Sequence, residues 1–196
     1  MSEFALYFVL GREHILDYAN GYDHILFVLA LCAIYLISDW RKILVLVTAF
    51  TVGHSVTLAL ATLEIISFNI DLIEFLIPIT ILLTALANLF HKESAIESGK
   101  KIQFNYILAL TFGLIHGMGF SNYLRALLGK NESIVTQLLA FNLGLEFGQL
   151  IIVIIFMGIT FVLVGLVGVP RRDWKMIISS AIAGISLILI KNNIYW

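Results

Sequence analysis

Charged side chains are scarce in this 196-residue sequence, at 13% of residues, where a soluble domain carries about 25%. Hydrophobic residues make up 60%, and the mean hydropathy is +0.99. This shortage of charge excludes an ordinary soluble globular protein. Twelve Lys and Arg face thirteen Asp and Glu, so the net charge of -1 leaves no basic surface for nucleic acid. The solvent that fits this composition is the lipid bilayer.

Cysteine and proline are rare as well. The single cysteine, Cys32, lies in an apolar run and cannot form an intramolecular disulfide, so cysteine usage does not indicate a redox compartment. The sequence has only two prolines and no stretch rich in serine and glycine, which argues against a linker or a second domain. We therefore expect one polytopic membrane domain over residues 1–196.

The apolar runs have the length of transmembrane helices, since a bilayer core of about 30 Å needs roughly 20 apolar residues. They predict an all-α integral membrane protein with six transmembrane helices, at about residues 22–38, 43–63, 72–90, 104–123, 134–169 and 174–190. The fifth run exceeds one untilted span, so we expect one long, tilted helix there. Residues 1–20 carry too many charges for a span, and we expect an interfacial helix.

The distribution of cations predicts the orientation. Eight of the twelve Lys and Arg follow the first, third and fifth predicted spans: Arg41, Lys42, Lys92, Lys100, Lys101, Arg171, Arg172 and Lys175. The positive-inside rule then places both termini on the outer face, N-out and C-out. We expect a multi-pass protein of the bacterial cytoplasmic (inner) membrane, surrounded by its lipids.

Six ionisable side chains lie within or just inside the predicted spans: Asp23, His24, His54, Glu74, His116 and Glu146. Such residues are costly in lipid and usually functional. In the predicted orientation all of them fall in the outer half of the bilayer. Imidazoles with carboxylates suit zinc, nickel, iron or copper. We predict a divalent transition-metal site, nickel or zinc, formed by His24, His54 and His116, with Asp23 and Glu146 as ligands or their partners.

Further residues accompany this set. Helical spacing places Ser55 beside His54, and Asn142 and Gln149 on one face with Glu146. With Glu74 and with His14 of the N-terminal segment, these are candidates for the surroundings of the metal. Simpler roles stay open: Asp23 also suits a helix N-terminus, Glu74 lies close to the interface, and a lone membrane histidine often bonds across a helix interface.

Several segments together resemble a known family. They are GYDHILFVLAL from Gly21, WRKILVLVTAFTVGHSVTLALA from Trp40, IEF around Glu74, LTALANLF around Asn88, FGLIHGMGF from Phe112 and LLAFNLGLEFGQL from Leu138. The chain resembles the HupE/UreJ family of hydrogenase and urease accessory membrane proteins, especially its second, shorter branch. That resemblance implies nickel or cobalt handling, metalloenzyme-maturation proteins as partners, and a role for Asp23 and His24 with the metal.

Two functions fit these observations, and whether the protein is an enzyme stays open. The first is a divalent metal permease or accessory protein of the nickel or cobalt type. Its inner half holds few polar groups: Thr48, Thr80, Thr84, Asn88 and Asn105. The alternative is an intramembrane zinc-dependent hydrolase, in which Glu146 or Asp23 acts as general base on a lipid or lipoprotein at the outer leaflet. A metal-sensing or assembly subunit is a third reading.

Overall fold

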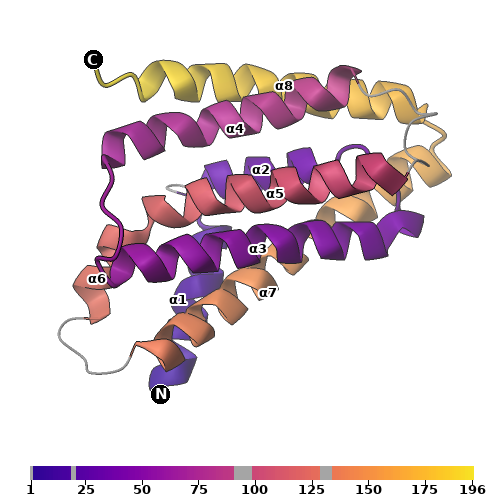
Figure 1. Ribbon diagram of the computed structural model, residues 1–196. Coiled ribbons are helices and arrows are strands. Elements are labelled where there is room, and N and C mark those ends of the chain that lie inside the picture. The colour runs from indigo at the N-terminus through magenta and orange to yellow at the C-terminus, as the bar shows by residue number, and fades with distance from the viewer. Residues whose placement is uncertain (1, 19–20, 91–98, 129–133) are drawn as a thin grey trace.

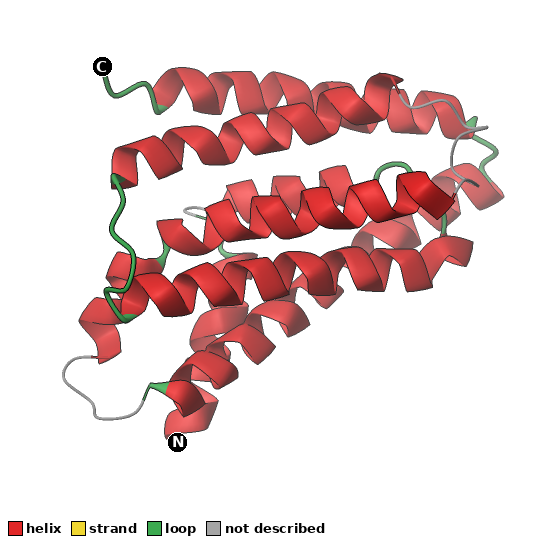
Figure 2. Ribbon diagram, viewed as in Figure 1, coloured by secondary structure: helices red, strands yellow, loops and turns green. Residues whose placement is uncertain are grey.

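The structure, a computed structural model, describes residues 2–18, 21–90, 99–128 and 134–196. Every regular element in these ranges is a helix, which confirms the all-α prediction (Figure 2). In chain order the elements are α1 (Glu3–Leu16), α2 (Tyr22–Cys32), the 3-10 turn η1 (Ile37–Asp39), α3 (Trp40–Thr62), α4 (Ile70–Phe90), α5 (Gly99–Gly119), α6 (Ser121–Leu128), α7 (Val135–Thr160), the π-helix η3 (Phe161–Leu166) and α8 (Arg171–Asn192).

Four of the described helical segments are long and apolar enough to cross a membrane: Ile37–Thr62, Ile70–Phe90, Val135–Leu166 and Arg171–Asn192. The chain is therefore a membrane protein by the length and composition of its helices. The apolar helix α2 has 11 residues and is only about 17 Å long, which is too short to span alone. Six spans and their orientation remain predictions, and Lys92 and Lys130 lie outside the described residues.

The fifth apolar run forms one continuous helix. The α-helical turns of α7 pass into the π-helical turns of η3 without interruption, giving 32 residues over Val135–Leu166. The helix ends where Gly168 adopts a φ of +83°, a left-handed conformation that glycine tolerates. Pro170 then precedes α8, where its missing N–H costs no helical hydrogen bond.

Helix α1 packs lengthwise along α7, and the two run in the same direction. Glu3 Oε1 accepts a hydrogen bond from Gln137 Nε2 at 2.8 Å near one end, and Ile15 contacts Gly148 near the other. Between them, a Cβ on Gly11 would overlap the carbonyl of Phe141. The backbones meet this closely because glycine stands at the contact, as in membrane helix pairs. This packing places α1 alongside a candidate span, while the interfacial position that the sequence suggested stays a prediction.

Helices α3 and α5 also approach each other closely at glycine residues. A Cβ on Gly53 would overlap the carbonyl of Leu110, and one on Gly117 would overlap the carbonyl of His54. The two backbones are therefore in direct contact beside His54 and His116. The close approach fixes the relative height of these two histidines in the bundle.

The short helix α2 occupies the middle of the bundle, between α4 and α7, while α4 and α8 lie side by side as a pair along one face (Figure 1). Most side chains of α2 are buried, including Leu26, Phe27 and Val28. The chain therefore enters the centre of the bundle where α2 begins, directly after α1. The first turn of α2, with Asp23 and His24, is thereby placed in the interior.

Candidate metal site

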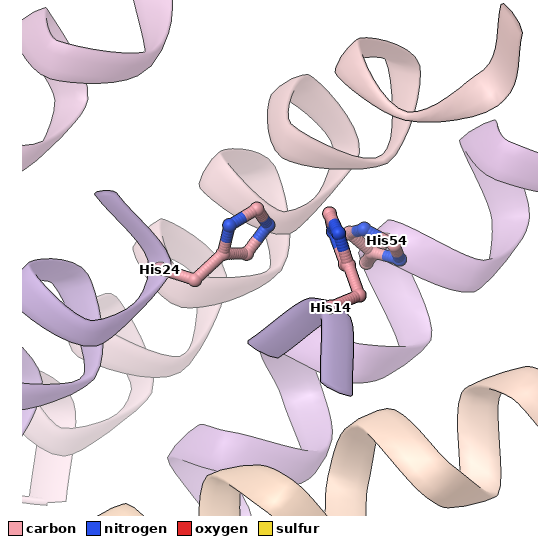
Figure 3. A group of neighbouring side chains, drawn as sticks. All are labelled: His14, His24 and His54. Atoms are coloured by element: carbon pink, nitrogen blue, oxygen red, sulfur yellow. The ribbon is translucent and has the colours of Figure 1, made fainter. Parts of the chain in front are cut away.

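Three histidines from three helices converge at the centre of the bundle. His14 comes from the last turn of α1, His24 from the first turn of α2 and His54 from the middle of α3 (Figure 3). Each offers a ring nitrogen, and these nitrogens all lie within 4.8 Å of one another. The ring centroids of His14 and His24 are 4.7 Å apart, and those of His24 and His54 are 6.1 Å apart.

The cluster forms at the interruption between α1 and α2. The Gly21 amide donates to the carbonyl of Asp17 at 2.9 Å, which closes the turn. A Cβ on Gly21 would lie 2.6 Å from the carbonyl oxygen of His14, so only glycine fits this close approach. The C-terminal end of α1, whose last turn carries His14, therefore lies at the histidines. Such an end carries partial negative charge and favours a cation.

Asp23 orients His24. Its Oδ1 lies 2.9 Å from Nδ1 of His24 and accepts the His24 backbone N–H at 2.8 Å. The ring proton of a neutral His24 therefore resides on Nδ1, facing the carboxylate. This leaves the lone pair of Nε2 free, and Nε2 is buried with no hydrogen-bond partner in the described part of the chain. A carboxylate that holds the far nitrogen of a histidine is the usual support of a metal-bound imidazole.

His116 and His54 also present free nitrogens. His116 Nδ1 donates to the carbonyl of Phe112 at 2.9 Å, which leaves its Nε2 buried and without a partner among described residues. His54 is 0% exposed, and neither of its ring nitrogens has a described partner. The ring centroids of His116 and His24 are 5.3 Å apart, so His116 stands at the edge of the three-histidine cluster. His14 Nε2 is likewise buried without a partner among the described residues. Buried polar atoms are normally satisfied, so four such imidazoles together indicate a ligand.

The spacing fits a metal only after the rings move closer together. Nitrogens bound to a tetrahedral zinc ion lie about 2.0–2.1 Å from the ion and therefore about 3.4 Å from one another. Nitrogens spread over as much as 4.8 Å must approach by up to about 1.4 Å. The donor set, neutral imidazole, is the one that binds zinc, nickel and copper.

Aromatic rings surround the histidines, and a cavity reaches them from one side. Phe120 lies tilted against His14 with ring centroids 3.9 Å apart, and the ring centroids of Phe50 and His116 are 5.2 Å apart. The cavity, about 900 Å³ in volume, is lined by His14, His24 and His116 and by four carboxylates, those of Glu13, Asp17, Asp23 and Glu74. Its acidic wall attracts cations, while the aromatic rings keep the histidines in a low-dielectric setting.

The remaining residues predicted for the metal site lie at different positions in the structure. Glu74 is exposed in the cavity wall, and Asn142 lies beside His54. Glu146 does not join the histidines, because its Oε1 accepts a hydrogen bond from Thr48 at 2.8 Å. Gln149 pairs with Thr51 at 2.7 Å, and the Ser55 hydroxyl donates to the carbonyl of Thr51.

His14 belongs to the centre of the cluster, where the sequence suggested only an accessory place. Its position was hidden because residues 1–20 lack the hydropathy of a span, so the depth of His14 in the bundle did not follow from the sequence. The informative signal was the glycine spacing: Gly11 on one side, and Gly144 with Gly148 on the other, mark a close helix contact.

Comparison with curated proteins and with solved structures gave no match. A family model described as HupE / UreJ protein matches residues 1–195. The match includes α1 and α2, which are separated at the candidate metal site, and all four histidines of that site. The chain therefore belongs to the HupE/UreJ family.

Proposed function

We propose that this protein binds a divalent first-row transition-metal ion through His14, His24 and His54 and carries it across the membrane as a permease of the nickel or cobalt type. The observation that carries the proposal is the convergence of buried imidazoles whose free nitrogens have no partner among the described residues. His116 adds a further nitrogen at the edge of the cluster, and Asp23 holds His24 in the tautomer that binds metal. The family is linked to metal handling for hydrogenase and urease, which agrees with this role.

The break between α1 and α2 supports a transport function. Helices α1 and α2 together have the length of one span but are separated at the histidines. Transporters commonly place substrate sites at such breaks, where the end of a half-helix contributes its carbonyls. We infer that α1 and α2 form one broken span and that the acidic cavity is the entrance for the ion. In the predicted orientation the cavity opens outward from a bacterial inner membrane.

The zinc hydrolase alternative is not favoured. Its mechanism requires a carboxylate beside the metal-bound water to act as general base. Glu146 is bonded to Thr48, away from the histidines, and Asp23 is engaged with His24. Neither carboxylate is therefore free for that task.

The test measures metal content and uptake together. Purified protein should bind one equivalent of Ni²⁺ tightly, and alanine at His24 or His54 should lower bound nickel at least tenfold, measured by plasma mass spectrometry. Proteoliposomes should accumulate Ni²⁺ down a gradient with the unmodified protein and not with these variants. The exposed Glu64 offers a control, since Glu64→Gln should change neither result. Full nickel binding in both histidine variants would refute the site.

A further inference from the structure

Three phenylalanine rings form a layer directly beside the histidines. Each ring stands one helical turn from a histidine on the same helix: Phe27 with His24 on α2, Phe50 with His54 on α3, and Phe112 with His116 on α5. The ring centroid of Phe27 lies 4.8 Å from that of Phe50 and 5.9 Å from that of Phe112. Rings at such separations are in direct contact. All three are buried, and we call them the phenylalanine layer.

The helix directions place the three rings on one side of the histidines. Phe27 follows His24 along α2, whereas Phe50 precedes His54 along α3. Because the rings of both pairs meet across the two helices, α2 and α3 are antiparallel here. Helices α3 and α5 run parallel, because the carbonyls of Phe50 and His54 meet glycines of α5 in the same chain order. Phe112 therefore lies on the same side as the other two rings.

The acidic cavity reaches the histidines from the opposite side. Its lining includes Gly119, which follows His116 along α5, whereas Phe112 precedes His116. No ring of the phenylalanine layer is among the described residues that line the cavity. The histidines thus stand between a polar entrance and an apolar layer. In the predicted orientation the layer faces the inner side of the membrane.

A divalent ion that leaves the histidines inward meets this layer first. A phenylalanine ring has no lone pair that could replace a water molecule or an imidazole on the ion. The attraction of a cation for a ring face is small beside the cost of an uncompensated charge in apolar surroundings. Apolar constrictions gate ion channels for this reason. The layer is therefore a barrier for as long as its rings stay in contact.

Polar groups resume beyond the layer. One turn farther along α2, the carbonyl of Ala30 accepts a hydrogen bond from Asn88 Nδ2 of α4 at 2.7 Å. Ala109 stands one turn past Phe112 on α5, and both alanines are fully buried. Small side chains and an amide therefore follow the rings on the path of an ion that moves inward.

We propose that Phe27, Phe50 and Phe112 form the inner gate of the metal path, which keeps the ion at the histidines until the rings separate. This inference rests on the proposed transport function. The common register of three rings with three histidines supports it, because core packing requires apolar bulk but no such register. A small side chain in the layer lowers the barrier, while leucine keeps it apolar and filled.

Nickel influx into proteoliposomes, together with nickel binding to the same purified full-length proteins, tests the gate. Phe27→Ala and Phe50→Ala should keep tight nickel binding and raise Ni²⁺ influx down a gradient at least about fivefold, because the apolar barrier is thinner. Phe50→Leu should return influx to the rate of the unmodified protein. Phe50→Val, a smaller truncation, should raise influx less and serves where the alanine variants do not fold.

Phe156→Ala is the matched control, because Phe156 is a buried ring that stacks on Trp174 near the C-terminal end of α7. It should change neither influx nor binding, and an equal rise in influx there overturns the gate. Unchanged influx in folded alanine variants of the layer also overturns it. Loss of nickel binding in those variants does so too, because the rings would then only position the histidines. Absence of nickel binding or of influx in the unmodified protein instead refutes the proposed function.

Discussion

Replacing Asp23 distinguishes a metal-supporting carboxylate from a simple helix-terminal residue. Its Oδ1 makes two contacts, one to Nδ1 of His24 and one to the His24 backbone N–H. The first contact fixes the imidazole for metal binding, and loss of such a support typically lowers metal affinity 10- to 100-fold. That is about 1.4–2.7 kcal/mol of binding free energy. The second contact stabilises the start of α2, and an acid there contributes about 0.3–1 kcal/mol to folding.

Two substitutions separate these contributions. Asp23→Asn keeps an acceptor oxygen but removes the charge, so we expect Ni²⁺ affinity to fall about tenfold with little loss of stability. Asp23→Ala removes both contacts, and we expect the affinity to fall by up to about 100-fold. Competition with a chelator of known affinity measures the Ni²⁺ dissociation constant, and thermal unfolding of the metal-free protein measures stability.

The result that would refute the reasoning is specific. If Asp23→Ala lowers the unfolding temperature of the metal-free protein while the dissociation constant stays within twofold, Asp23 serves only the start of α2. Asp71→Ala is the control, because Asp71 is an exposed acid in the first turn of α4, away from the histidines. It should leave nickel affinity unchanged.

Three further results are expected. Gly144→Leu should cost at least about 1–3 kcal/mol of folding stability and displace His14, because even a Cβ at this position overlaps the Phe8 carbonyl. The control Gly184→Leu, which has open space around it, should retain nickel binding and near-normal thermal stability. Nickel affinity should decrease as pH decreases, since only the neutral imidazole binds metal; titrations at several pH values measure this, and an affinity independent of pH would contradict an imidazole site. Single cysteines placed near Glu3 and Asp71 should react with an impermeant reagent from outside and one near Arg172 should not; the native Cys32 is buried and adds little background. Reversed labelling would contradict the predicted orientation.

Local sequence patterns were sufficient for much of the fold. The apolar run after Ile134 predicted one long helix, and α7 with η3 forms it. The residue chemistry of His24 and His54 predicted a metal site, and the structure places both in one cluster. The long-helix inference succeeds because hydropathy is a property of short sequence windows and decides which of them can cross a bilayer. Metal binding by the histidines stays a prediction.

The sequence by itself determined a helical membrane protein whose apolar runs contain imidazoles and carboxylates, because too few charges remain for any other solvent. Only the tertiary structure decided which of these groups meet. Glycine contacts draw α1 along α7 and α3 against α5, which brings His14 to His24 and His54. Glu146 was expected at the metal but bonds Thr48 instead. Residues on different helices share a site only through helix rotation and crossing, and these depend on packing between side chains far apart in the sequence.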